Sequence, residues 1–326
     1  MPVLNRKNKR FCIKRGEFMR IAIVGAGAMG SFFGARLSRT GSDEVCLIDV
    51  WQEHLDEIVN KGLLIKEHES VEIYHDFKTY SASELAGPMD LVIFFVKSIL
   101  TRKAAEESIS LFGGGTLALT LQNGLGNVEA LGEILGEENV IAGTTAHGAM
   151  LVGPGNIQHT GIGETIIGEL NGEITDRILM IQKTFNQAGI ETSLSQNVSG
   201  LVWDKLLVNV GINALTGITG IKNGELLKCR EIEQLLELAV EEGVCIAKAK
   251  GITLSSKDPV EHTKEVCRAT ATNKSSMLQD ILKGDKTEID MMNGAILREG
   301  RLLGIGTPIN LCLTNLIKFK EEENGH

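Results

Sequence analysis

The first half of the chain alternates short apolar runs with segments of helical periodicity. Five runs are rich in Val, Ile, Leu, Ala and Phe, as is typical of strands covered on both faces of a parallel sheet. Between the first two runs, residues 31–38 place small and apolar side chains at helical spacing. This alternation predicts an α/β fold with a Rossmann-type doubly wound sheet. The five runs are 20–24, 45–49, 90–96, 116–121 and 140–143.

The pattern changes twice in the remainder of the chain. Residues 143–170 are rich in Gly and Thr, and we expect them to form antiparallel strands that close the sheet, with His147 and His159 as structural hydrogen-bonding residues. From about Gln196 the periodicity becomes helical, which predicts an all-α second domain. We therefore expect a dinucleotide-binding domain at 19–194 and a helical substrate and catalytic domain at 195–326.

Residues 1–18 differ from both domains. They carry six basic side chains and one acidic one, and no apolar segment of the kind found in a secretory signal follows them. Two interpretations remain open. The segment is a disordered basic extension, or it lies upstream of the true start of translation at Met19, where the first strand begins.

A glycine motif follows the first apolar run. In this strand–turn–helix context, Gly25 permits a tight turn, Gly27 lets the backbone approach a pyrophosphate, and Gly30 lets the helix pack closely on the strand. The amino terminus of the helix offers free N–H groups to phosphates. The motif predicts a dinucleotide site formed by the turn residues Gly25, Ala26, Gly27, Ala28, Met29 and Gly30.

Three polar residues follow strands at the edge where such sheets bind ligands. Asp49 ends the second strand, where a carboxylate accepts hydrogen bonds from the adenosine ribose and repels a 2′-phosphate, so the residue favours NAD(H) over NADP(H). Lys97 and Asn123 follow later strands, and we expect them beside the cofactor and the substrate.

The helical half carries a polar stripe. Lys205, Asn209 and Asn213 are spaced four residues apart on an otherwise apolar helix, which places them on one face. A buried polar group without a partner costs about 1–3 kcal/mol. The stripe therefore indicates either a ligand pocket or a network of hydrogen bonds between helices.

Composition narrows the functional classes. A net charge of −9 and an aromatic content of 4% argue against a nucleic-acid partner. The six cysteines are scattered without metal-ligand spacing, which predicts reduced thiols in a cytoplasmic protein and no metal site. The longest apolar run, 91–96, is too short to cross a membrane.

Several ordered motifs give the chain, from about Met19 to its carboxyl end, a resemblance to the ketopantoate reductase (2-dehydropantoate 2-reductase) family. The glycine turn opens the series, and motifs in the helical half continue it in the same order. The matching stretches are 25–30, 96–97, 122–126, 143–147, Trp203-Asp-Lys-Leu with Asn209 and Asn213, 223–226, 275–280 and 287–294.

The resemblance implies specific roles and a reaction. It implies that Lys205 and Glu288 are catalytic and that a small 2-oxo acid is the substrate, with reduction of ketopantoate to (R)-pantoate in pantothenate and coenzyme A biosynthesis. It also implies NADPH as the cofactor, whereas Asp49 departs from the family's arginine near this position and modestly favours NADH. The substrate-contacting positions implied are Asn123, Asn209, Asn213, Asn223 and Ser276.

Two other functions stay open from the sequence. One is an NADH-dependent D-2-hydroxyacid dehydrogenase acting on another 2-oxo acid, which would share Lys205 and Asp49. The other is a nicotinamide-binding sensor without catalytic activity, which the presence of Lys205 and Glu288 disfavours. The sequence leaves the oligomeric state open, with a homodimer as the candidate, and it gives no indication of a membrane partner.

Overall fold

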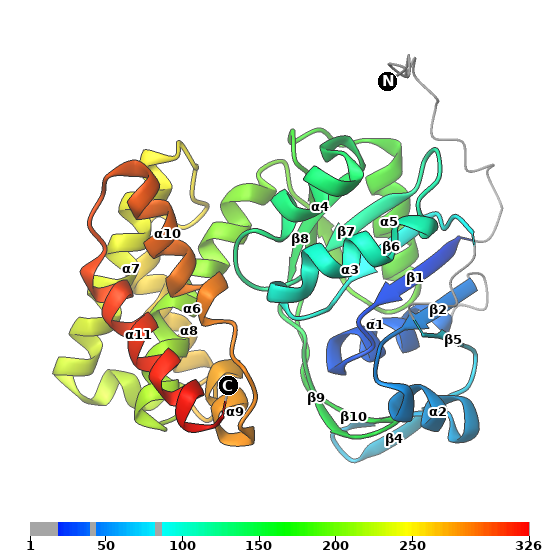
Figure 1. Ribbon diagram of the computed structural model, residues 1–326, viewed down its shortest axis with the longest axis horizontal. Helices are drawn as coiled ribbons and strands as arrows, with labels where there is room; N and C mark the ends of the chain where they lie inside the picture. Colours follow the sequence, from blue (N-terminus) through cyan, green and yellow to red (C-terminus); the bar gives the residue numbers. More distant parts are fainter. Residues whose placement is uncertain (1–18, 40–43, 82–86, 326) are drawn as a thin grey trace. The chain divides into compact units, whose positions relative to one another are not determined.

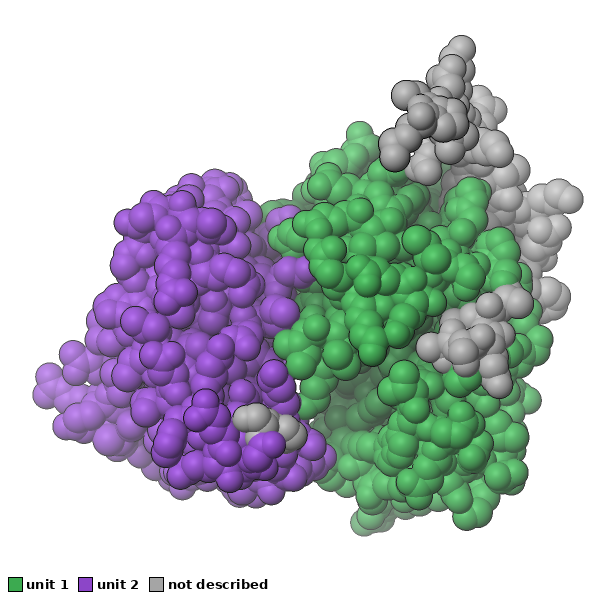
Figure 2. All heavy atoms as spheres, viewed as in Figure 1, with its two compact units in different colours: residues 1–122, 127–198 green, residues 123–126, 199–326 purple. Residues whose placement is uncertain are grey.

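A computed structural model describes residues 19–39, 44–81 and 87–325 (Figure 1). The basic extension expected at 1–18 lies outside the described residues. Two compact units divide the chain, coloured separately in Figure 2: unit 1 contains the residues up to 122 together with 127–198, and unit 2 contains 123–126 and 199–326.

The division falls later than the boundary drawn at 194/195 from the sequence. The Ser195 N–H still donates to the Ile167 carbonyl of the sheet at 2.9 Å. The polypeptide leaves the sheet only as the first long helix of the second half begins at Val198. The loop Asn123–Gly126 is the other difference, because its contacts place it in unit 2 although it directly follows a strand of unit 1.

Unit 1 is built on an eight-stranded sheet in the order β12-β11-β8-β7-β6-β1-β2-β5. All neighbouring pairs are parallel except β11 with β8. The strands are β1 (Arg20–Val24), β2 (Glu44–Ile48), β5 (Lys78–Tyr80), β6 (Leu91–Phe94), β7 (Leu117–Thr120), β8 (Val140–Thr145), β11 (Thr165–Glu169) and β12 (Thr192–Leu194).

Side chains of the central strands point alternately into two apolar cores, one on each face of the sheet. Ile21 and Ile23 of β1 pack into one core with α1 and α5, and Ala22 and Val24 pack into the other with α3 and α4. This is the doubly wound arrangement expected from the continuous apolar runs. The helical segments of unit 1 are α1 (Ala28–Ser38), α2 (Gln52–Lys61), η2 (Ser98–Leu100), α3 (Thr101–Glu107), η3 (Ile109–Leu111), α4 (Asn127–Leu135), η4 (Glu137–Asn139) and α5 (Asp176–Gln187).

A second sheet, of four strands in the order β4-β3-β10-β9, corrects one expectation. Of the segment 143–170, only β8 and β11 join the main sheet, whereas β9 pairs with β10, and β10 pairs in parallel with β3, the partner of β4. The physical reason is burial: Leu63, Ile65 and Ile157 of this sheet share a core with Phe32 of α1. Its strands are β3 (Leu63–Glu67), β4 (Ser70–Tyr74), β9 (Gly148–Gly153) and β10 (Asn156–Gly161).

The described secondary-structure elements of unit 2 are all helical, and α6 (Val198–Thr219) contributes the largest share of its core. By length and composition α6 is the one described helix apolar enough to cross a membrane, but 67% of its most apolar window is buried, as in the core helix of a folded domain. The other segments are η5 (Asn223–Lys228), α7 (Arg230–Ala249), α8 (Pro259–Ala269), α9 (Ser276–Lys283), η6 (Ile289–Met291), α10 (Asn293–Leu303) and α11 (Pro308–Glu323).

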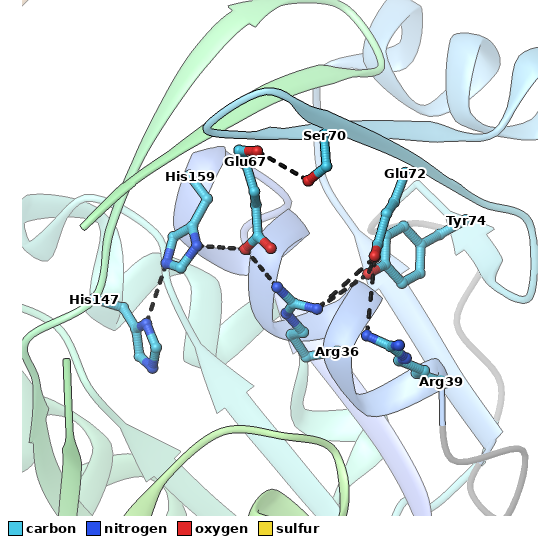
Figure 3. Close-up of polar contacts among 8 residues, drawn as sticks. All are labelled: Arg36, Arg39, Glu67, Ser70, Glu72, Tyr74, His147 and His159. Atoms are coloured by element: carbon cyan, nitrogen blue, oxygen red, sulfur yellow. Dashed lines mark hydrogen bonds and ion pairs between the residues drawn. The ribbon is translucent and has the colours of Figure 1, made fainter. Parts of the chain in front are cut away.

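A chain of hydrogen bonds ties the second sheet to α1 (Figure 3). The His159 Nδ1–H donates to Glu67 at 2.5 Å, and Glu67 also pairs with Arg36 of α1. His147 Nδ1 lies 3.2 Å from the other ring nitrogen of His159, and that ring stacks on Phe32. His147 and His159 therefore take part in the hydrogen-bond network that joins the second sheet to α1.

The electrostatics of this chain keep His147 neutral. Burial, together with the neighbouring His159, lowers the pKa of His147 to about 4. Burial would raise the pKa of Glu67, but the hydrogen bonds and positive charges of Arg36 and His159 together outweigh it, and the pKa is lowered. Both groups thus bind protons less readily in the folded protein than in the unfolded chain.

We predict that the free energy of unfolding falls as the pH drops from about 6.5 to about 4. The pKa of His147 is lower in the folded protein than in the unfolded chain, so between these two pKa values only the unfolded chain binds the proton. Protonation then favours unfolding, and the stabilisation that is fully present above the unfolded pKa is lost as the pH falls. After allowance for partial exposure, we expect about 1–2 kcal/mol from His147. Urea unfolding at pH 7, 5.5 and 4.5 measures this loss.

The variant His147→Asn keeps a donor toward His159 and removes the titrating ring, so its stability should fall less between pH 7 and 4.5 than that of the wild type. His262→Asn, at a half-exposed position on α8, is the control and should behave as wild type. Equal pH slopes for His147→Asn and the wild type would contradict the assignment.

Candidate functional site

The glycine turn is a tight backbone junction between β1, β2 and α1. The Gly25 N–H donates to the Ile48 carbonyl at 2.9 Å. A Cβ on Gly30 would lie 1.9 Å from the Gly25 carbonyl oxygen, so a side chain there is excluded. A Cβ on Gly27 would meet nothing within 4 Å, so the backbone at Gly27, the residue before α1, is open to an approaching group.

Asp49 is part of this turn. One carboxylate oxygen accepts the Ala26 N–H at 2.7 Å, and the other accepts the Trp51 N–H at 2.9 Å. The carboxylate therefore fixes the glycine turn to the end of β2.

His54 and Ser31 support the turn from behind, and sequence analysis did not identify them. The Ser31 hydroxyl donates to the Ala26 carbonyl at 2.7 Å and lies 3.1 Å from His54 Nε2. His54 Nδ1 accepts the Gly155 N–H at 3.0 Å, which fixes the tautomer with the proton on Nε2. His54 is fully buried, and burial lowers its pKa.

A cleft of about 290 Å³ opens in front of the turn, entirely within unit 1. Gly25, Gly27, Asp49 and Lys97 line it together, whereas Ala26, Ala28, Met29 and Gly30 complete the turn without lining the cleft. Its other walls are largely apolar and suit an adenosine. They are formed by Val24, Ile48, Val50, Phe95, Val96, Leu100, Lys103, Ala104, Glu107 and Ser108.

The residues of this cleft fit a dinucleotide. The open backbone at Gly27 and the amino terminus of α1 suit a pyrophosphate. The fixed carboxylate of Asp49 suits a ribose diol and opposes a phosphate in the same place. No group of three or more His, Cys, Asp or Glu side chains among the described residues is arranged to hold a metal ion.

A second polar group lies in unit 2, along one face of α6. The Asn213 amide is buried, with its nitrogen 3.5 Å from the Ser276 hydroxyl of α9 and 3.4 Å from Met292 Sδ. Burial lowers the pKa of Lys205 to about 8, and the Glu288 carboxylate opposes this shift. The structure thus brings Lys205 close enough to Glu288, and Asn213 close enough to Ser276, for each pair to interact.

The start of α9 is held so that Ser276 faces solvent. The Ser275 hydroxyl caps the helix by accepting the Leu278 N–H at 3.1 Å, and it lies 2.7 Å from the Thr216 hydroxyl of α6. Ser275 is buried, whereas Ser276 is exposed at the first helical position. An exposed hydroxyl at a helix amino terminus is suited to a carboxylate ligand.

Asn223 makes contacts of a different kind, and Asn123 lies in a loop that a neighbouring residue fixes. The buried Asn223 side chain donates to the Thr270 hydroxyl at 2.9 Å. The backbone N–H of Asn223 donates to the Asn273 carbonyl at 3.1 Å, so Asn223 anchors the segment after α8. Asn123 begins the loop in which the Leu125 N–H donates to the Met291 carbonyl at 2.9 Å. Asn209 is half-buried on the same face as Asn213.

Sequence analysis missed a set of buried polar residues that holds α6 in place. Asn293 donates to the Val210 carbonyl at 3.1 Å and to Asn310 at 3.0 Å, and Glu242 accepts the Ile309 and Asn310 N–H groups at the start of α11. In addition, Asp204 accepts the N–H groups of Ser255 and Ser256. Each contact joins residues that are more than forty positions apart or lie on different helices, so no local pattern predicts the partners. The one local sign of such a contact is a polar residue within an apolar run, such as Asn293.

Comparisons with known proteins give one consistent result. The model of the family described as "Ketopantoate reductase PanE/ApbA" matches residues 21–172, and the model of its carboxy-terminal part matches 197–321. A 2-dehydropantoate 2-reductase of Halobacterium salinarum is 35% identical over 305 residues, which cover 94% of this chain and all of the relative.

Solved structures agree across the same length. A ternary structure of D-mandelate dehydrogenase with NADH and anilino(oxo)acetate superimposes with a TM-score of 0.89 at 30% identity, covering 94% of this chain and 99% of that one. A ketopantoate reductase of the PanE/ApbA family from Ralstonia eutropha JMP134 gives 0.87 at 33% identity, covering 94% of this chain and all of that one.

We predict that Asp49→Ala destabilises unit 1 even without any nucleotide, because two backbone N–H groups lose a charged acceptor. The expected loss is about 1–3 kcal/mol, with a smaller loss for Asp49→Asn, which keeps one acceptor oxygen. Thermal unfolding of the nucleotide-free protein measures it. Asp56→Ala on α2, where the carboxylate bonds only to an exposed glutamine, is the control. If Asp49→Ala and Asp56→Ala have equal melting temperatures, Asp49 does not support the turn.

Proposed function

We propose, on the premise that the chain belongs to the ketopantoate reductase family, that this protein reduces 2-dehydropantoate to pantoate with NADH as the preferred cofactor. The chain is an oxidoreductase acting on a 2-oxo acid. The proposal rests on two sets of residues, each within one unit: the lining of a cleft in unit 1 that fits a dinucleotide, and the Lys205, Asn213, Ser276 and Glu288 group in unit 2.

Asp49 supports NADH over NADPH. The carboxylate is already bonded to two backbone N–H groups at 2.7 and 2.9 Å, so it is fixed at the cleft and cannot easily turn away from a 2′-phosphate. A fixed negative charge disfavours a phosphate at that place. The NADH in the D-mandelate dehydrogenase structures supports the same choice.

Lys205 is proposed as the proton donor. A bound reduced nicotinamide supplies the hydride, and the oxygen that becomes a hydroxyl needs a proton. With its pKa lowered to about 8, Lys205 is mostly protonated at neutral pH and releases its proton more readily than an ordinary lysine. The ammonium also stabilises negative charge that develops on the oxygen.

The other polar residues of unit 2 are proposed to bind the substrate. The exposed hydroxyl of Ser276, at the amino terminus of α9, suits the carboxylate of the oxo acid. Asn209 and Asn213 lie farther along the face of α6 and can orient the oxo acid, and Asn123 is proposed to border cofactor and substrate. Glu288 keeps Lys205 charged, since its carboxylate raises the pKa that burial lowers.

An NADH-dependent D-2-hydroxyacid dehydrogenase is the second candidate function. The specific observation in its favour is the TM-score of 0.89 to D-mandelate dehydrogenase over nearly the whole of both chains. Such an enzyme would use the same residues for cofactor and proton transfer, and it would differ in the side chain of the 2-oxo acid that it accepts.

We predict that Lys205→Ala lowers kcat by about 10²–10⁴, the usual effect of losing an acid–base group, while NADH binding stays near that of the wild type. Stopped-flow oxidation of NADH and a fluorescence titration measure the two quantities. The exposed Lys228→Ala variant of unit 2 is the control. A kcat for Lys205→Ala within a few-fold of wild type would exclude the role.

The pH dependence follows from the same group. The reducing activity should fall as the pH rises through about 8, because the proton on Lys205 is lost there. Glu288→Gln should move this fall to lower pH, because the carboxylate that holds the pKa of Lys205 up is gone. An unchanged profile in Glu288→Gln would show that Glu288 does not act on Lys205.

The direct test of the function is a panel of 2-oxo acids with NADH and NADPH. We expect ketopantoate to give the highest kcat/KM and NADH to be preferred, with Asp49→Asn shifting the preference toward NADPH. A panel in which ketopantoate is inert and benzoylformate or a branched 2-oxo acid reacts would select the second candidate. Preference of the wild type for NADPH would refute the role of Asp49 in choosing the cofactor.

A further inference from the structure

The loop Asn123–Gly126 fits against unit 2 through its backbone. It directly follows β7 and Gln122, yet its contacts belong to unit 2. The Leu125 N–H donates to the Met291 carbonyl at 2.9 Å, and the Leu125 side chain packs against the apolar core of unit 2. The loop is therefore attached to unit 2 by a hydrogen bond and by apolar packing.

Gly124 is the point of closest approach. Its φ of +82° lies in the left-handed region, and a Cβ there would lie 2.6 Å from the Met291 carbonyl oxygen and 2.8 Å from the Met291 Cβ. The obstacle is backbone, which cannot move aside as a long side chain could. The close contact of the loop with Met291 thus requires a residue without a side chain at position 124.

Met291 in turn is tied to Glu288. It ends η6, and its N–H donates to the Glu288 carbonyl at 3.0 Å, so both residues belong to one tight turn. The segment before this turn is fixed as well, because the Thr287 N–H donates to the buried carboxylate of Glu321 on α11 at 2.7 Å. A short path of backbone contacts therefore leads from Asn123 through Gly124 and Met291 to Glu288.

We propose that Gly124 is a positioning residue: its contact with Met291 sets where Asn123 stands relative to Glu288, and through Glu288 relative to Lys205. The inference rests on the proposed function, because Asn123 and Glu288 matter together only if a 2-oxo acid reacts beside them. A displacement of about 1 Å at such a contact can cost on the order of 10²-fold in rate. Loss of the contact should therefore lower kcat, whereas NADH affinity should change little, because none of these residues lines the cleft in unit 1.

Gly126 provides a matched control within the same loop. It also has a left-handed φ, +96°, but a Cβ there would meet nothing within 4 Å. Gly124→Ala and Gly126→Ala therefore share the backbone strain of a side chain at positive φ and differ in the collision with Met291. The pair separates loss of the contact from general strain in the loop.

The experiment measures kcat, NADH affinity and amide exchange in the full-length wild type and both variants. We expect Gly124→Ala to lower kcat at least ten-fold with NADH affinity within about two-fold, and Gly126→Ala to stay within about three-fold in both. Hydrogen–deuterium exchange should show the Leu125 amide protected in the wild type and in Gly126→Ala, and faster in Gly124→Ala. Gly124→Asn and Gly126→Asn repeat the comparison with a residue that tolerates positive φ, should an alanine variant fail to fold.

Each outcome decides the inference. Equal kcat values for the two variants, whether both normal or both low, would overturn it, as would rapid exchange of the Leu125 amide in the wild type. A wild type without activity on any 2-oxo acid would overturn the proposed function instead. In that case, exchange that is faster in Gly124→Ala alone would still establish the contact with Met291.

Discussion

The arrangement of unit 2 depends on one constraint, which is that the positively charged Lys205 lies on its central helix, α6. Lys205 lies among apolar neighbours on α6, and its burial lowers the pKa to about 8. Removing a charge from water is costly unless opposite charge or dipoles compensate. The Glu288 carboxylate supplies part of that compensation, and it can do so only if α6 and η6 keep a fixed separation. The buried polar contacts from Asn293, Asn310 and Glu242 to α6, α7 and α11 provide this rigidity.

Unit 1 has a different constraint, because the proposed cofactor carries a pyrophosphate that the backbone of the glycine turn would have to approach. Gly30 must lack a side chain because the Gly25 carbonyl occupies its place, and Gly27 leaves the approach open. Asp49 then holds the turn from one side, and the Ser31–His54–Gly155 contacts hold it from the other. The second sheet is thus connected to the glycine turn, because Gly155 lies between β9 and β10.

The sequence predicted what depends on local pattern. The apolar runs identified the central strands, and the glycine spacing located the turn, because each of these signals lies within a few consecutive residues. The spacing of Lys205, Asn209 and Asn213 likewise predicted a shared face on α6. The second sheet could not be predicted in this way, since β3 pairs with β10 about ninety residues later. The same holds for His54, whose partner Gly155 is 101 positions away, and for the attachment of residues 123–126 to unit 2.

In the proposed function, the two units recognise different ligands. In that proposal, Asp49 and the glycine turn of unit 1 bind the cofactor, and Ser276, Asn213 and Lys205 of unit 2 bind the substrate and supply the proton. The loop Asn123–Gly126 is the exception in this scheme. It continues directly from β7, whose neighbour β6 leads into Lys97 at the cleft of unit 1, and yet it is bonded to the turn that follows Glu288. Within this loop, Gly124 is required by contact with another main chain and not by a ligand.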